Sequence, residues 1–395
     1  MKIVIPQGFT LAVTSAGFKT PGKTDLALAV SDVPAAAAGV FTRNQFKAAP
    51  VQIGQHILHE RDQARAVLIN TGQANACTGA EGLANCRLTQ EMVAVVTGLA
   101  PSEILPASTG VIGAQLRMDA WQQAIPRLVE NMGGADIEDF ASAIMTTDAF
   151  PKYAGEQFRM GAGMVSIAAV AKGAGMICPN MATMLSVVLC DAAVDSASWR
   201  ELFPRAVAAT FNRATVDGDT STNDTLYALA NGVSGVQIQN EDDFAVLEAA
   251  VTRVLAKLAY MLVQDGEGAT KVLHIRVSGA DCAGDAEQCA RTVGHSQLVK
   301  TAMYGRDANW GRIVAAVGRC GVPFNPADLV VNVCGVELFK REQPTTLDFD
   351  SLLSEALAQR DINIDISLGD GPGVYTLLAS DLSHEYVSIN ADYRS

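Results

Sequence analysis

Short apolar runs rich in β-branched residues alternate along the chain with longer stretches of helical period. Three such runs, at 66–69, 186–189 and 329–333, have the length and composition of buried strands. Residues 243–262 instead repeat their apolar positions with the period of a helix. The N-terminal segment before residue 18 is interpreted as a further, first strand. The pattern predicts a mixed α/β protein but does not distinguish a parallel sheet from an antiparallel one.

The length of the chain predicts more than one domain. At roughly 150 residues per domain, 395 residues correspond to two or three domains. The small, turn-forming residues of 279–285 separate two strand and helix patterns. We therefore expect a domain boundary near 275–295.

Composition and charge exclude several classes of protein. Hydrophobic residues make up 49% of the chain and charged residues 18%, so much of the chain must be buried. The net charge of −13 would repel nucleic acids and anionic membranes, and neither is expected as a partner. Pro6 and Gly8 interrupt the N-terminal apolar run, and Pro179 and Asn180 argue against a membrane span at 173–190. The eight cysteines form no CxxC pair, which fits a reducing, cytoplasmic location.

Metal and cofactor signatures are weak in this sequence. His56 and His59 are three residues apart, but no third ligand accompanies them, and the other histidines lie in no triad motif. The oxygen-rich residues of 217–224 lack the glutamate that closes a calcium loop and are interpreted as a hydrogen-bonded turn. No GxxxxGK[ST] phosphate loop is present. The sequence therefore predicts no metal and no cofactor.

The segment 172–185 carries the most specific chemical pattern. It reads KGAGMICPNMATML and passes from glycines through a Pro-Asn turn into an apolar strand, with Thr183 at the transition. A cut of the Ala182–Thr183 bond would give Thr183 both a hydroxyl nucleophile and a free α-amine that can act as its general base. The alternative is a threonine that only opens a buried strand.

Three other segments contain residues suited to acyl transfer. Residues 106–113 combine small side chains with glycine, so backbone N–H groups there can stabilise an oxyanion. Glu267 lies between two glycines, which lets its carboxylate approach a cationic amine closely. The Thr-Thr-Asp sequence at 146–148 is compatible with a site or with a helix cap.

Six motifs in a common order resemble those of ornithine acetyltransferase, the arginine-biosynthesis enzyme also called glutamate N-acetyltransferase. The resemblance extends from GVFTRNQFKAAPV at 39–51 to the C-terminal SDLSHEYVSINADYRS at 380–395. The motifs are STGVIG at 108–113, IMTTDAFPK at 144–152, KGAGMICPNMATML at 172–185, TVDGDTSTNDT at 215–225, DGEGATK at 265–271 and NWGRI at 309–313.

The resemblance implies a precursor that cleaves itself before Thr183. The products would be an α chain, Met1 to Ala182, and a β chain, Thr183 to Ser395, assembled as an α2β2 heterotetramer. The implied fold is the αββα sandwich of aminopeptidases and amidases with an N-terminal nucleophile, to which residues 1–182 and 183–285 contribute. A smaller C-terminal α/β domain, 286–395, follows.

The resemblance also implies the reaction and the site residues. The family moves acetyl from N2-acetylornithine to glutamate through an acetyl-enzyme, and bifunctional members also accept acetyl-CoA as donor. Catalysis is expected from Thr183, with the Thr109 hydroxyl and the Gly110 N–H as the oxyanion hole. The residues that match substrate-binding positions are Thr146, Lys172, Thr183, Glu267, Asn390 and Ser395.

Some positions depart from the family pattern, and other activities remain open. Ala149 replaces a frequent Thr, residues 70–77 differ from NSGNANACTG at two places, and Ala379 and Ser380 stand where many members have Cys before Asp. None of these changes touches an expected site residue. The alternatives are an amidase or aminopeptidase of the same architecture, a secondary-metabolism acetyltransferase with another acceptor, and a non-catalytic binding protein.

Overall fold

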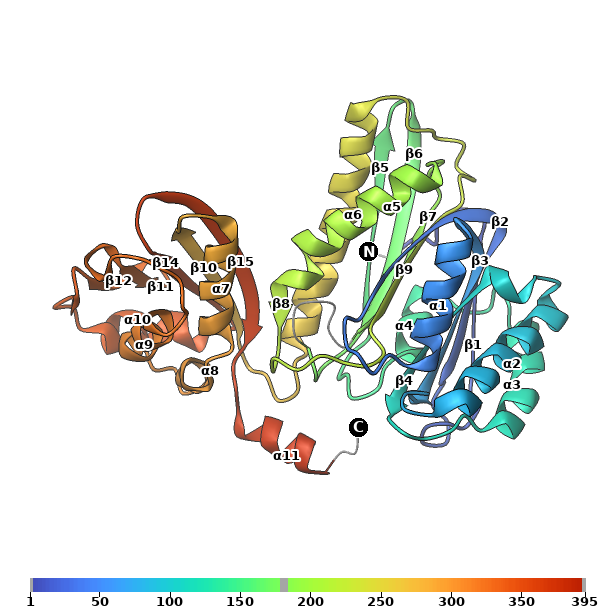
Figure 1. Ribbon diagram of the computed structural model, residues 1–395, viewed down its shortest axis with the longest axis horizontal. Helices are drawn as coiled ribbons and strands as arrows, with labels where there is room; N and C mark the ends of the chain where they lie inside the picture. The colour runs from blue at the N-terminus through green and yellow to red at the C-terminus, as the bar shows by residue number, and fades with distance from the viewer. Residues whose placement is uncertain (1–2, 178–183, 393–395) are drawn as a thin grey trace. The chain divides into compact units, whose positions relative to one another are not determined.

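The apolar runs of the sequence form strands in the computed structural model, which describes residues 3–177 and 184–392 (Figure 1). The run at 66–69 lies in β3, the run at 186–189 in β7, and the run at 329–333 in β11. The helical period at 243–262 lies within α6, and the N-terminal strand is β1. These predictions from the sequence are confirmed.

The described chain divides into two compact units. Of the described residues, the first unit comprises 3–177, 184–212 and 219–262, and the second comprises 213–218 and 263–392. The second unit thus begins upstream of the 275–295 region, because the strand at 272–279 pairs with later strands and belongs to their sheet. Among the described residues, no helix combines the length and the apolar character needed to cross a bilayer.

The first unit holds one sheet of eight strands among its described residues, in the order β4-β3-β2-β9-β7-β6-β5, with β1 also paired to β2. Its strands are β1 (Phe9–Thr14), β2 (Leu26–Phe41), β3 (Gln63–Gln73), β4 (Ile104–Val111), β5 (Lys152–Met160), β6 (Gly163–Lys172), β7 (Leu185–Cys190) and β9 (Thr225–Ala230). Its helices are α1 (Ala49–Glu60), α2 (Gly79–Thr97), α3 (Met118–Glu130), α4 (Ile137–Ala143), α5 (Ser196–Ala209) and most of α6 (Glu241–Gln264), with short 3-10 turns at Pro101–Glu103 and Phe211–Arg213.

The long strand β2 turns this sheet into two facing layers. Its first part pairs with β1 and its last part with β9, and its register with β3 shifts between Val30 and Ala35. The Tyr227 hydroxyl on β9 donates to the Pro106 carbonyl on β4, although β4 and β9 are separated in the strand order. Val67 of one layer and Leu229 of the other belong to the same buried core.

Helices cover the outer faces of both layers. Trp121 of α3 packs with Leu28 and Leu68 on the face of β2 and β3 that points away from the shared core, and α2 lies beside α3 (Figure 1). On the other layer, the Trp199 indole of α5 donates to the Ala228 carbonyl of β9. The helix-sheet-sheet-helix arrangement expected from the sequence is therefore confirmed.

The second unit is built on a mixed sheet of seven strands, in the order β13-β12-β11-β14-β10-β15-β8. Its strands are β8 (Ala214–Thr215), β10 (Val272–Gly279), β11 (Val330–Val333), β12 (Val336–Lys340), β13 (Gln343–Pro344), β14 (Asp361–Ser367) and β15 (Gly371–Ser380). Its helices are α7 (Ala283–Gly294), α8 (Gln297–Tyr304), α9 (Trp310–Gly318), α10 (Phe349–Ala358) and α11 (His384–Asp392), with a 3-10 turn at Pro326–Asp328. Ile275 and Ile364 of adjacent parallel strands share a core with Val293 of α7.

Candidate active site

The expected site residues fall into three groups. Thr109, Gly110, Thr146 and Lys172 lie in the first unit, and Glu267 and Asn390 lie in the second. Three further positions lie outside the described residues: Ala182, Thr183 and Ser395. Each group is described by itself.

The expected oxyanion-hole pair lies at the end of β4 and not in a loop. Thr109 and Gly110 pair in parallel register with Thr71 and Gly72 of β3. Gly110 has φ +130°, and a Cβ added to it would lie 2.3 Å from the carbonyl carbon of Gly72. Only glycine fits this backbone conformation and this close approach. Because the strand end is so crowded, its backbone groups hold a fixed direction, as an oxyanion hole requires.

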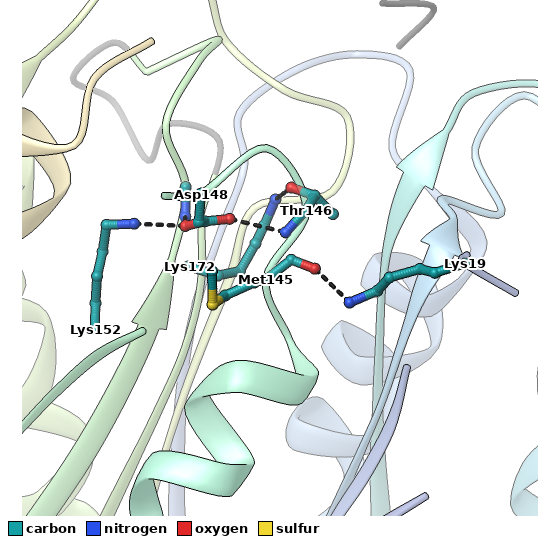
Figure 2. Close-up of polar contacts among 7 residues, drawn as sticks. Lys19, Met145, Thr146, Asp148, Lys152 and Lys172 are labelled. Atoms are coloured by element: carbon teal, nitrogen blue, oxygen red, sulfur yellow. Dashed lines mark hydrogen bonds and ion pairs between the residues drawn. The ribbon is translucent and has the colours of Figure 1, made fainter. Parts of the chain in front are cut away.

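Thr146 and Lys172 are brought together in the first unit. Lys172 is the last residue of β6, and its Nζ donates to the Thr146 hydroxyl at 3.0 Å (Figure 2). Lys172 also pairs across the sheet with Leu185, the first residue of β7. The buried ammonium of Lys172 thus lies on the strand next to β7, which begins two residues after Thr183 in the chain.

Asp148 holds the backbone around this pair in place (Figure 2). One of its oxygens accepts from Lys152 Nζ at 2.6 Å and from the Gly173 amide at 2.7 Å. The other oxygen accepts from the Thr146 amide at 2.9 Å. One carboxylate therefore fixes the backbone beside both Thr146 and Lys172. The interpretation of residues 146–148 as a helix cap is wrong. Helix α4 already ends at Ala143, and the chain continues into strand β5.

The charges around Asp148 set its ionisation. Burial alone would raise the pKa of Asp148, but the charges of Lys152 and Lys172 and the hydrogen bonds from Lys152 and Thr146 lower it below its ordinary value. The carboxyl is therefore ionised at neutral pH. Because two buried ammonium groups accompany one carboxylate, the cluster carries a net positive charge suited to an anionic substrate group.

Lys19 adds a third ammonium at the edge of this cluster. Its Nζ donates to the Met145 carbonyl at 2.6 Å and to the Ala143 carbonyl at 3.2 Å (Figure 2). Burial lowers its pKa to about 8, against the opposing charges of Asp25 and Asp148. Sequence reasoning missed Lys19 because it lies far from residue 145 in the chain. Lys152 could have been found from the sequence, because it follows Asp148 by four residues in the motif IMTTDAFPK.

In the second unit, Glu267 and Asn390 are in direct contact. The Asn390 side-chain amide donates to Glu267 Oε2 at 2.8 Å. The following residue, Gly268, has φ +67° and leaves no room for a Cβ, because the Tyr386 amide nitrogen lies 2.6 Å from the Cβ position. The Ser383 hydroxyl donates to the Gly268 carbonyl at 2.6 Å. The DGEG turn and α11 are therefore packed together, and Glu267 has a defined orientation.

Taken together, the layered fold and the buried cationic cluster are those of an α/β protein with a candidate site at strand ends, where the charge suits an anionic group. The sequence pattern of the ArgJ family matches residues 10–395. The chain is 63% identical to the arginine biosynthesis bifunctional protein ArgJ of Nitratidesulfovibrio vulgaris over 390 residues, covering 99% of both chains. It is 44% identical to the Geobacter sulfurreducens protein of the same name, covering 98% of this chain and 99% of that one.

A solved structure agrees with these relatives. The crystal structure of the ArgJ protein of Bacillus halodurans is 36% identical, with a TM-score of 0.51, and covers 53% of this chain and 100% of its own. The chain belongs to the ArgJ family. The resemblance to the ornithine acetyltransferases of arginine biosynthesis, inferred from six motifs, is confirmed.

Proposed function

We propose that this chain transfers acetyl from N2-acetylornithine to glutamate through an acetyl ester on Thr183, after cutting its own Ala182–Thr183 bond. The observation that carries the proposal is the hydrogen bond from buried Lys172 to half-buried Thr146, beside the first residue of β7. An ammonium in that position can bind an amino-acid carboxylate next to the nucleophile. The names of the relatives place their activity in arginine biosynthesis.

The self-cleavage requires no second enzyme. The Thr183 hydroxyl attacks the Ala182 carbonyl, the peptide C–N bond breaks, and the hydroxyl proton moves to the released amine. Water then hydrolyses the ester, which leaves an Ala182 carboxylate and a free Thr183.

Acetyl transfer then proceeds in two steps. Thr183 Oγ attacks the acetamide carbonyl of acetylornithine and its proton is taken up by the Thr183 amine. The resulting ammonium gives this proton to the ornithine nitrogen as the C–N bond breaks, and ornithine leaves. The amine of glutamate attacks the acetyl ester and restores the hydroxyl. In both steps the Thr109 hydroxyl and the Gly110 N–H donate to the oxyanion.

The two substrates share an amino-acid end that the expected binding residues match. In this proposal Lys172 and Thr146 bind the carboxylate of the substrate's amino-acid end, and Glu267 positions an ammonium group. Asn390 and Ser395 complete the proposed binding residues. Acetyl-CoA as a second acetyl donor to glutamate is part of the proposal, since the relatives are named bifunctional proteins and a second donor would give a second activity. An α2β2 assembly, a cytoplasmic location and a reaction without cofactor complete the proposal.

Intact-mass spectrometry of the denatured protein beside a Thr183→Ala variant tests the proposal. We expect two chains from the wild type, divided between Ala182 and Thr183, and one whole chain from the variant. Acetylornithine and glutamate should then give acetylglutamate and ornithine. A wild type that stays whole would indicate a non-catalytic protein, and an acetyl-enzyme that only water discharges would indicate a hydrolase. Acetyl-CoA as sole donor distinguishes a bifunctional enzyme from a monofunctional one.

A further inference from the structure

Asn223 and Asp224, at the end of the TVDGDTSTNDT motif, bind two different parts of the first unit. They directly precede β9, and their exposed fractions are 6% and 0%. The expected active-site residues do not include them. Because Asn223 and Asp224 are adjacent in the chain, the backbone groups to which their side chains are hydrogen-bonded are held at a fixed separation.

Asp224 binds the first described residue after Thr183. Its Oδ1 accepts from the Met184 amide at 3.0 Å, and the next residue, Thr225, donates its own amide to the Met184 carbonyl at 3.1 Å. The Met184 nitrogen is covalently bonded to the carbonyl carbon of residue 183. The Asp224 carboxyl therefore fixes the peptide unit that joins the nucleophile to β7.

Asn223 binds the strand that ends in the oxyanion-hole pair. Its Nδ2 donates to the Ser108 carbonyl at 2.8 Å and to the Ala74 carbonyl at 2.6 Å. Ser108 is bonded to Thr109, so this contact fixes the peptide unit that leads to the oxyanion hole. The Thr222 hydroxyl donates to Asn223 Oδ1 at 2.7 Å, which orients the amide with its N–H groups toward the two carbonyls.

A carboxyl group at position 224 is costly for stability. Asp224 Oδ2 is buried and has no hydrogen-bond partner in the part of the chain that the structure describes. Full burial raises the pKa of Asp224 well above its ordinary value, although the Met184 amide and the Lys172 charge oppose the shift. A buried polar atom without a partner destabilises the fold. The hydrogen bond to the Met184 amide is thus made by a carboxyl group in an unfavourable, fully buried position.

We propose that Asn223 and Asp224 are positioning residues that together hold the peptide unit after Thr183 and the strand end before Thr109 at the separation that self-cleavage and acetyl transfer need. The inference rests on the proposed role of Thr183 as nucleophile. Displacement of a reacting group by about 1 Å can slow a reaction by about 100-fold. Neither residue transfers a proton in this role, and the Asp224 carboxyl acts as a hydrogen-bond acceptor for the Met184 amide.

The opposite ends of the same strands provide matched control residues. Asp191 follows β7, is 0% exposed and accepts from the backbone amides of Ser166 and Gln7. Asn231 follows β9, is 9% exposed and donates to the Gln7 carbonyl at 2.9 Å. Removing either side chain breaks comparable buried hydrogen bonds far along the strand from the Met184 contact.

The experiment compares Asp224→Ala and Asn223→Ala with Asp191→Ala and Asn231→Ala in the full chain. Timed cell-free synthesis with intact-mass detection gives the rate of self-cleavage, and melting temperature reports the folded state. We expect the two site variants to cleave at least about tenfold more slowly and the controls to stay within about threefold of the wild type, at similar losses of melting temperature. Asp224→Asn keeps an acceptor for the Met184 amide and should cleave within about threefold of the wild type.

The outcomes separate this proposal from the proposed function. If the wild type is cut and the site variants cleave as fast as the controls, the positioning role is wrong and the function of Thr183 stands. A folded Asp224→Asn variant that does not cleave would also overturn the proposal, because it would show that the carboxyl itself is needed. An uncut wild type would contradict the proposed function and this inference with it.

Discussion

Lys152 Nζ lies 2.6 Å from Asp148 Oδ1, and neither side chain is exposed to solvent. The pair links the start of β5 to the loop that carries Thr146. Two charges removed from water are stable only while both are present, because each alone would carry an uncompensated desolvation cost. The geometry around Lys172 and Thr146 therefore depends on this buried ion pair, because Asp148 also accepts from the Thr146 and Gly173 amides.

Loss of one partner of this pair should destabilise the fold strongly. In the uncut Thr183→Ala chain, Lys152→Met should lower the free energy of unfolding by about 3–5 kcal/mol, because Asp148 is left buried without its ion pair. The exposed Arg205–Glu248 pair provides the control, since Arg205 is 47% exposed. Arg205→Met should cost less than about 1 kcal/mol. Urea unfolding measures both free energies. Equal losses in the two variants would contradict the explanation that burial makes the Lys152–Asp148 pair matter more than the exposed pair.

Gly110→Ala should lower the kcat of acetyl transfer by more than a substitution at another glycine of positive φ angle does. Its added Cβ would lie 2.3 Å from the Gly72 carbonyl carbon and would push the end of β4 away from β3. We expect kcat to fall by about 100-fold or more, the effect of losing an oxyanion-hole donor. Gly113 also has a positive φ angle, +86°, but no atom lies within 4 Å of its Cβ position. Gly113→Ala should therefore keep kcat within about threefold, and similar losses in both variants would contradict the steric explanation.

Thr146→Val should weaken substrate binding by removing the hydroxyl that accepts from Lys172 Nζ. Valine has the shape of threonine, so the loss isolates one hydrogen bond to a charged group, and kcat/KM should fall by about 10- to 100-fold. The neighbouring Thr147, which is also half-buried, gives the control variant Thr147→Val. Steady-state kinetics with acetylornithine and glutamate measure both. Equal kcat/KM values in the two variants would show that Thr146 has no role in the site.

Lys300 should make stability depend on alkaline pH. Its Nζ donates to the Val216 carbonyl and to the Ser380 hydroxyl, and its side chain is 4% exposed. Burial lowers the pKa of Lys300 to about 8, although Asp217 and Asp381 oppose the shift. In the unfolded chain the pKa is about 10.4. Above pH 8 the unfolded chain therefore binds a proton that the folded chain has lost, and stability rises with pH.

The measurement is the difference in unfolding free energy between the wild type and Lys300→Met. Between pH 8 and pH 10 the wild type should gain about 1–2 kcal/mol relative to the variant. Other titrating groups are common to both proteins and cancel in the difference. A difference that does not change with pH would show that Lys300 keeps its ordinary pKa.

Local sequence predicted the elements of this fold because the physics of each element is local. The β-branched run at 186–189 forms β7, and the 3.6-residue period at 243–262 lies within α6. The six motifs also identified the family, which full-length relatives confirmed. The sequence could not predict the sheet order, because the same apolar run fits several neighbours. The pairing of Lys172 with Leu185 depends on register over long sequence separations.

The candidate site, like the fold, was predicted in part from the sequence and decided in part by the tertiary structure. The match to the family motifs indicated Thr146, Lys172, Glu267 and Gly110 as site residues. The sequence did not show that Gly110 lies at the end of a strand, because the pairing of β4 with β3 is a tertiary contact. Burial by distant parts of the chain also decided the ionisation of Asp148 and Lys19. Chemical identity is a property of the sequence, whereas proximity and desolvation exist only once the chain has folded.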